Sequence, residues 1–549
     1  MDRSQTARHA GEGTTRRRVP EWLLTTLAAL LVFLALVAPP GTQHLTPLAI
    51  LRIPVEGLLA AALLLVLPAR PRRIVALALG SLLGLLTLLR IIQLAFSGIR
   101  GRQFDPVFDW PQLGNGVSLL QREIGSLGAF AVAAGAVALA IAVVLVVTLS
   151  VGRLARVATD HRRTTGRTVA GLAVIWLVCL TFSVQLAPSL PVASRSVVEL
   201  AYDAGHQVRT SVENQRQFDA ELSAADDTSV SGPLAALRGK DVVFAFVESY
   251  GRIALEDPEF APTVKAILDD GTRQLDAAGF ASRSGYLTSP ISGGDSWLAH
   301  ATLQSGLRVA NQNSFEKLVE SDRLTLTSAF NDAGWRTVAV MPANRGPWPA
   351  GDYYGFDQIY DEQSLDIQSR NYFGFQAPDQ YTLSFFQRTD RERAGREPVM
   401  AKIALVTSHW PWHMIPYLRD WNDVGDGAVF DEPDAGQSAS AQVVMLDNAR
   451  MRDGYRRTIE YSLSTLVSYV QTYGDDDLVL VLLGDHQPPT YLIGEDKGLD
   501  VPITIVTRDR AVLDQITDWG WEAGLRPSPH APVWPMESFR DRFLTAFSK

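Results

Sequence analysis

The chain has 549 residues, a mean hydropathy of +0.05 and a formal net charge of −9 at pH 7, and its length predicts at least two structural units. Residues 1–190 carry 18 Arg, no Lys and 8 acidic residues, whereas the rest of the chain carries 32 basic and 51 acidic residues. The acidic part would repel phosphates, which excludes nucleic-acid binding, and the single cysteine excludes an intrachain disulfide or a thiolate metal cluster.

Five apolar stretches in the first part of the chain are each long enough to cross a membrane, which takes about 20 residues. They lie at roughly 21–39, 47–68, 74–97, 127–150 and 168–187. The first follows a basic leader at 1–20 and lacks a small-residue cleavage pattern, so an uncleaved anchor is expected rather than a signal peptide.

The placement of arginine orients these predicted spans. The leader has five Arg, the 69–73 loop has three and the 151–167 loop has five, whereas the intervening segments 40–46 and 98–126 together have three. Because positive segments stay in the cytoplasm, the sequence predicts a multi-pass plasma-membrane protein with a cytoplasmic N-terminus. Five spans then place everything after residue 188 outside the cytoplasm.

The outer loop contains an aromatic segment at 104–112. Its rings suit the membrane interface and could contact a lipid substrate. Residues 189–238 then show little apolar patterning and are interpreted as an extracytoplasmic stalk with an amphipathic helix near 195–222.

From residue 239 onward, short β-rich runs alternate with helical stretches. Expected strands lie at 242–247, 337–341, 402–406, 478–483 and 502–506, and expected helices at 261–278, 297–306, 323–333 and 453–473. This alternation predicts an α/β domain over 239–549 with a doubly wound, mostly parallel sheet. In such sheets the active site gathers at the carboxyl ends of the strands.

Acidic and imidazole side chains follow two of these strands directly. Glu248 comes after 242–247, and Asp485 and His486 come after 478–483. Two carboxylates and one imidazole suit a divalent cation such as Mn²⁺, Mg²⁺ or Zn²⁺. The alternative is that each is a solvated residue at a strand end.

A serine stands at the start of the helix expected near 297–306. Ser296 follows the flexible turn 292–295, and a helix N-terminus stabilises an anion. Beside a metal ion, its hydroxyl could lose a proton and attack phosphorus. The alternative is an ordinary helix-capping serine.

Three further groups follow strands. His409 comes after 402–406 and could bind a phosphate oxygen or protonate a leaving group, as could His413. Arg345 comes after 337–341 and could clamp a phosphate. Each alone is more often structural, but reactive groups at so many strand ends predict an enzyme.

These motifs resemble the alkaline phosphatase/sulfatase superfamily and, more closely, the lipoteichoic-acid synthase-like, membrane-bound phosphoglycerol transferases. The resembling residues are Phe246-Val247-Glu248-Ser249-Tyr250, Gly293-Gly294-Asp295-Ser296, Ser408-His409-Trp410-Pro411 and Gly484-Asp485-His486. The resemblance implies a sulfatase-like fold behind five spans. Ser296 is followed by neither the Pro nor the Arg of a sulfatase signature, so a formylglycine is not expected.

The resemblance also implies roles for single residues. One divalent metal ion, most often Mn, would be held by Glu248, Ser296, Asp485 and His486. Ser296 would also be the nucleophile, His409 would contact the substrate phosphate or leaving group, and Arg345 or Trp348 would line the headgroup pocket.

The function predicted from these residues is a metal-dependent, membrane-anchored phosphotransferase. It would move a phosphoglycerol-like headgroup from a membrane phospholipid to a cell-envelope glycan or polymer acceptor through a serine intermediate. Two alternatives stay open: a phosphatase, phosphodiesterase or sulfatase-like hydrolase on the same fold, and a non-enzymatic sensor or scaffold.

Overall fold

The protein is described from a computed structural model, which divides the chain into two compact units. The first comprises residues 1–94 and 112–206, and the second comprises 95–111 and 207–549. The residues described are 20–38, 48, 51–187, 190–224, 234–346, 348–372, 377–431, 440–445, 447–494 and 497–548.

Apolar helices dominate the first unit. They are α1 (Glu21–Val37), α2 (Val55–Val66), α3 (Ala69–Arg100), α4 (Trp110–Asp160) and α5 (Arg162–Thr181). Among the described residues, three helical segments are long and apolar enough to cross a membrane: 69–98, 124–160 and 162–181. α1 and α2 are apolar but shorter, at 17 and 12 residues, so the count of five spans stays a prediction. The start of the expected second span lies partly outside the described residues.

Short elements link the helices of the first unit. Strand β1 (Ile53–Pro54) pairs in parallel with β4 (Ala193–Ser194), and β2 (Gln185–Ala187) pairs with β3 (Leu190–Pro191). Helix α6 (Ser196–Ser223) confirms the helix predicted near 195–222. Its residues from Gln207 onward belong to the second unit.

A nine-stranded sheet forms the centre of the second unit. Its order is β12-β6-β11-β10-β5-β9-β7-β8, and β13 also pairs with β6. The strands are β5 (Asp241–Val247), β6 (Ala281–Thr288), β7 (Arg336–Val340), β8 (Gln358–Tyr360), β9 (Val399–Leu405), β10 (Leu478–Gly484), β11 (Asp500–Thr507), β12 (Glu522–Ala523) and β13 (Val533–Pro535). All five strands expected from the sequence are present.

The sheet is mixed: among the described strands, five pairings are parallel and three are antiparallel. β11 runs antiparallel to both β10 and β6. The connection 485–499 returns the chain to the edge at which it left β10, so β11 points in the opposite direction. β6, β10, β5, β9 and β7 all run the same way, which brings their carboxyl ends to one edge.

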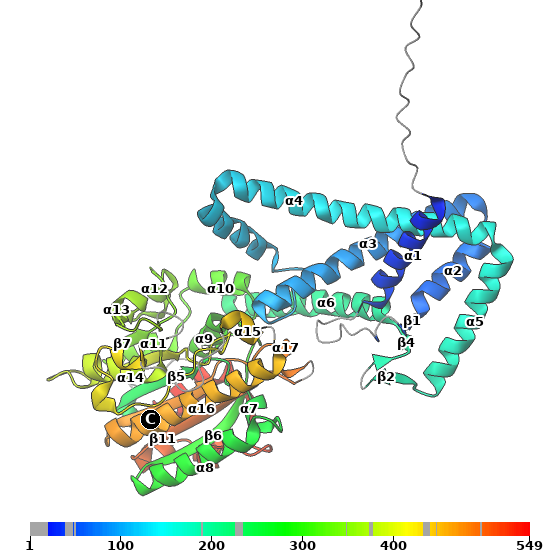
Figure 1. The fold of residues 1–549 in the computed structure, drawn as a ribbon. Helices are drawn as coiled ribbons and strands as arrows, with labels where there is room; N and C mark the ends of the chain where they lie inside the picture. Colours follow the sequence, from blue (N-terminus) through cyan, green and yellow to red (C-terminus); the bar gives the residue numbers. More distant parts are fainter. Residues whose placement is uncertain are drawn as a thin grey trace, which may run out of the picture. The chain divides into compact units, whose positions relative to one another are not determined.

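Helices cover both faces of this sheet, as expected for a doubly wound domain. On β5, Val243 and Ala245 face one apolar core and Phe244 and Phe246 face the other. The first core is completed by α8 (Ala261–Ala277), α14 (Asp379–Phe386) and α16 (Asn448–Tyr473), and the second by α9 (Ser296–Ser305), α11 (Leu326–Asp332) and α19 (Ser538–Phe547). Figure 1 shows α8 and α16 side by side.

Shorter helices lie in the connections between the main elements of the second unit. They are α7 (Ile253–Glu256), α10 (Gln312–Val319), α12 (Ala350–Tyr354), α13 (Glu362–Leu365), α15 (Ala441–Met445), α17 (Thr490–Ile493) and α18 (Arg510–Asp514). The fully buried strands β5 and β10 lie between the two cores, so the residues that follow them emerge from a rigid support.

Candidate active site

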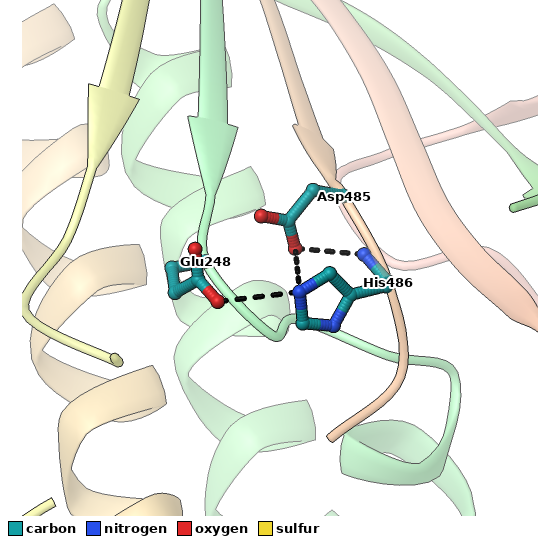
Figure 2. A group of neighbouring side chains, drawn as sticks. All are labelled: Glu248, Asp485 and His486. Carbon is teal, nitrogen blue, oxygen red and sulfur yellow. Dashed lines mark hydrogen bonds and ion pairs between the residues drawn. The ribbon is translucent and has the colours of Figure 1, made fainter. Parts of the chain in front are cut away.

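The two central strands β5 and β10 bring their polar end residues together. Val247 pairs with Gly484 in parallel register, so Glu248 and Asp485 leave the sheet as neighbours. The backbone N–H of Ser249 donates to Asp485 Oδ1 at 2.8 Å, and His486 Nε2 lies 3.3 Å from Glu248 Oε1. Figure 2 shows both carboxylates facing the imidazole of His486. All three side chains are buried or nearly so.

Ser296 joins this group from the helix α9. Its Oγ donates to Glu248 Oε2 at 2.9 Å and lies 3.1 Å from His486 Nε2. The preceding turn is tied to the chain after β10, because Ser292 forms a β-bridge with Gln487 and Gly293 N–H donates to the Gln487 carbonyl at 2.8 Å. Ser296, and not Ser292, therefore reaches the acidic cluster.

The ionisable groups of the cluster shift one another's pKa values. Burial and repulsion from Glu248 raise the pKa of Asp485. Burial alone would lower the pKa of His486, but attraction from Asp485 and Glu248 raises it to about 10. Burial opposes the ionised form of Glu248 as well, yet hydrogen bonding and attraction from His486 hold its pKa below the usual range. Two buried carboxylates thus share one imidazole.

This donor set fits a divalent cation. One ligand atom each from Glu248, Asp485 and His486 lies within 4.8 Å of the others, and the Ser296 hydroxyl adjoins two of them. Buried carboxylates are costly unless a positive charge offsets them. Carboxylate, hydroxyl and imidazole donors suit Mn²⁺, Mg²⁺ or Zn²⁺.

The other predicted site residues have more varied surroundings. His409 is close enough to Glu248 to lower the pKa of that carboxyl, and its Nδ1 lies 2.7 Å from the Trp410 carbonyl. His413 is half-buried, and burial lowers its pKa. Arg345 is half-exposed, and its Nε lies 3.3 Å from Glu362.

Two buried basic residues near the site went unnoticed in the sequence. The ring of His300 packs against that of Phe246, with centroids 4.1 Å apart and the planes tilted by 45°, and its Nε2 lies 3.9 Å from Asp485 Oδ2. Lys402 on β9 is fully buried, and its Nζ lies 5.2 Å from the Trp348 ring. Burial lowers the pKa of Lys402 to about 7. His300 follows Ser296 by one helical turn, which was a usable signal; Lys402 lies inside an apolar strand and gave none.

Comparison with known protein families now places the domain. The sulfatase family matches residues 269–511, a range that includes Ser296, Asp485 and His486. The chain contains a sulfatase-family domain. This match confirms the superfamily recognised from the motifs and the expectation of a sulfatase-like phosphotransferase or hydrolase. A search of curated proteins finds no match to the chain.

Solved structures similar to the sulfatase-family domain are distant in sequence. The lipoteichoic acid synthase LtaP from Listeria monocytogenes is 13% identical, with 57% of this chain and 74% of that chain covered and a TM-score of 0.37. The phosphoglycerol transferase GacH from Streptococcus pyogenes is 14% identical, with 62% and 92% covered and a TM-score of 0.33. The C-terminal periplasmic domain of EcEptC from Escherichia coli, in complex with Zn, is 14% identical, with 57% and 82% covered and a TM-score of 0.33.

Proposed function

We propose that this protein is a metal-dependent, membrane-anchored phosphotransferase. It would move a phosphoglycerol-like headgroup from a membrane phospholipid to a glycan or polymer of the cell envelope. The observation that carries the proposal is the position of the Ser296 hydroxyl, 2.9 Å from Glu248 and 3.1 Å from His486 in a cluster suited to one divalent ion.

The proposal assigns each part of the chain a role. Residues 1–20 would form a cytoplasmic leader, 21–188 a five-span membrane region, 189–238 a stalk and 239–549 the extracytoplasmic catalytic domain. Three span-length apolar helices support membrane anchoring. An enzyme tethered at the membrane meets a phospholipid donor at a high effective concentration, because both are confined to the same surface.

The site would hold the cation through Glu248, Ser296, Asp485 and His486, and Mn²⁺ is the ion we propose. When bound, the cation would lower the pKa of the serine hydroxyl and offset the charge of the phosphodiester. Glu248 already accepts the hydrogen of the Ser296 hydroxyl, so the proton has a destination when the oxygen becomes a nucleophile.

In the first step, Ser296 Oγ bonds to phosphorus and the bond from phosphorus to the diacylglycerol oxygen breaks. His409 is near Glu248 and would donate a proton to that leaving oxygen, a role also open to His413. The position of Ser296 at the N-terminus of α9 favours the negative charge that gathers there. The product is a headgroup phosphoester on Ser296.

In the second step, an acceptor hydroxyl bonds to phosphorus and the bond to Ser296 Oγ breaks. The acceptor's proton passes to the histidine that lost one in the first step, and Glu248 returns to Ser296 Oγ the proton that it accepted, so Ser296, Glu248 and the histidine are all restored. Water in place of the acceptor would give hydrolysis with the same residues, so the fate of the headgroup separates a transferase from a hydrolase.

The test uses the full chain in liposomes containing Mn²⁺ and phosphatidylglycerol labelled in the headgroup glycerol, with glucose as the probe acceptor. We expect one diacylglycerol for each headgroup transferred, a glucose adduct, and label on the Ser296 peptide after acid quenching. Label that persists in Ser296→Ala would contradict the serine intermediate. Release of free glycerol phosphate, with no glucose adduct or transfer to lipid, would favour the hydrolase.

A further inference from the structure

A short segment from the membrane part of the chain belongs to the catalytic unit. Residues 95–111 comprise the end of α3 and the start of the outer loop, and they cluster with residues 207–549. Phe104, expected at the membrane interface, is instead fully buried between Phe96 and Trp110, with ring centroids 5.3 and 5.1 Å away. This segment is therefore folded as part of the catalytic unit.

Helix α6 also holds this segment in place. Gln207 Nε2 donates to the Phe104 carbonyl at 3.2 Å, and Ser211 Oγ donates to Asp105 Oδ2 at 2.6 Å. Both α6 residues belong to the second unit. The segment thus has a defined position relative to the sheet.

Two arginines of the segment donate hydrogen bonds to Asp295, the residue before the proposed nucleophile. Arg100 donates to Asp295 Oδ1 at 2.9 Å, and Arg102 Nε donates to Asp295 Oδ2 at 2.8 Å. Arg102 is itself fixed by a two-pronged bond to Asp109, at 2.7 and 2.8 Å. The Asp295 side chain is 1% exposed and that of Arg102 is 16% exposed, so their pair is largely shielded from water, whereas the Arg100 side chain is 35% exposed.

The backbone between the two arginines is packed as closely as glycine allows. Gly101 has φ +71°, and a Cβ added to it would lie 2.6 Å from the Gly293 carbonyl oxygen and 2.6 Å from the Pro489 ring. Gly293 leads to Ser296 and Pro489 follows His486, so the tip of the segment touches both chain stretches that build the site.

Asp295 needs such support because of its backbone. It precedes α9 with φ +63°, a left-handed conformation that costs a residue other than glycine of the order of 1 kcal/mol. Its carboxylate does not cap the helix but is committed to the two arginines. Its backbone conformation fixes the direction in which Ser296 leaves the turn.

We propose that Arg100 and Arg102 are positioning residues of the active site: they hold Asp295, and through it the Ser296 hydroxyl, against Glu248 and His486. This inference rests on the proposed role of Ser296. Misplacing a reacting atom by about 1 Å costs on the order of 100-fold in rate.

The experiment compares Arg100→Ala and Arg102→Ala with Arg526→Ala in full chains reconstituted in phosphatidylglycerol liposomes with Mn²⁺. Arg526 is a matched control, because it pairs with Asp269 at 2.7 Å and its side chain is 35% exposed, as is that of Arg100. We expect kcat to fall by roughly 10- to 100-fold in the two test variants, with KM nearly unchanged and the control unaffected.

Two further readouts separate positioning from general structural damage. Mn²⁺ affinity should fall in Arg102→Ala, because Ser296 is a proposed ligand. The thermal midpoint should fall as well, because Asp109 and Asp295 lose a buried partner, so affinity and kcat are measured well below that midpoint. Arg102→Lys should restore only part of kcat, because an ammonium cannot reproduce the planar fork that reaches both Asp109 and Asp295.

If Arg102→Ala fails to fold, Asp295→Asn tests the same contact, because asparagine tolerates the left-handed backbone but lacks the charge. Ser296→Ala runs in parallel. If Ser296→Ala keeps full activity, the proposed function fails. If Ser296→Ala is inactive while the arginine and Asp295 variants keep wild-type kcat, or lose only KM, the positioning proposal alone is overturned.

Discussion

Buried charged residues lie at both ends of strands β5 and β10, but their partners differ. At the amino end, Asp241 pairs with Arg391 at 3.0 Å and with Arg396 at 2.7 Å, and Arg391 also pairs with Asp475 at 2.9 Å. At the carboxyl end, two carboxylates, Glu248 and Asp485, share the single imidazole of His486. The same strands therefore end in a neutral network on one side and an acidic cluster on the other.

The difference separates structural charges from functional ones. In the amino-end network each carboxylate meets a guanidinium, so the network is complete within the protein itself. In the carboxyl-end cluster two carboxylates share one imidazole beside a serine hydroxyl, and this donor set suits a bound cation. The variants below test this difference between the two ends of the strands.

The largest effect is expected for Ser296→Ala, which removes the proposed nucleophile from the carboxyl-end cluster. Transfer should fall by about 10⁴-fold or more, about 5 kcal/mol, because the covalent route is lost. The free energy of unfolding should barely change, since the hydroxyl is only partly buried. Steady-state rates and urea unfolding of the reconstituted chain check this. An active variant would show that the cluster works without this hydroxyl.

The amino-end network should respond in stability rather than in activity. Asp241→Ala would leave the buried Arg391 and Arg396 without their shared partner, at a cost of about 3–5 kcal/mol in unfolding free energy. Asp475→Ala is the control: it removes a partner that is 56% exposed and should cost less than about 1 kcal/mol. Urea unfolding followed by tryptophan fluorescence measures both. Equal costs would mean that burial does not distinguish these pairs.

At the carboxyl end, Asp485→Asn should weaken metal binding rather than stability. Mn²⁺ affinity should fall by about 100-fold, whereas the unfolding free energy of the metal-free chain should hold or rise, because burial and Glu248 already oppose ionisation of Asp485. Asp390→Asn serves as the control, since Asp390 is buried but pairs with Arg336 at 3.2 Å. Calorimetric Mn²⁺ titration gives the affinities. Unchanged affinity in Asp485→Asn would remove Asp485 from the ligand set.

The Mn²⁺ affinity of the cluster should also depend on pH. The raised pKa of His486 means that the metal-free chain holds a proton there at neutral pH, and a cation must displace it. Burial and Glu248 also raise the pKa of Asp485, to about 8, so up to two protons leave when the cation binds. Mn²⁺ affinity should therefore rise by about 10- to 100-fold per pH unit between pH 6 and 8. The stabilisation that protonated His486 gives to the metal-free chain is lost as pH rises through its pKa near 10. Flat affinity across this range would contradict protonation of the imidazole.

The sequence indicated the two strands of this comparison more readily than their surroundings. The runs at 242–247 and 478–483 are apolar throughout, as fully buried strands are, and the polar residues after them stand out. β6 was missed because Ser282, Ser284 and Gly285 interrupt its pattern. Gly285 is required there, because a Cβ would lie 2.7 Å from Trp521 Nε1.

Contacts between distant parts of the chain had no local signature. Arg102 and Asp295 are 193 residues apart, and in the sequence Arg102 served only to orient the spans. The antiparallel direction of β11 depends on which edge the chain re-enters, which its residues do not encode. The headgroup pocket proposed around Arg345 and Trp348 stays a prediction.

The manganese content of the purified full-length chain tests the central claim most directly. After loading with Mn²⁺ and desalting, elemental analysis should find one ion per wild-type chain and none per His486→Ala chain, with Asp241→Asn loaded like the wild type. A wild-type chain without metal, or a His486→Ala chain that keeps its ion, would contradict the account.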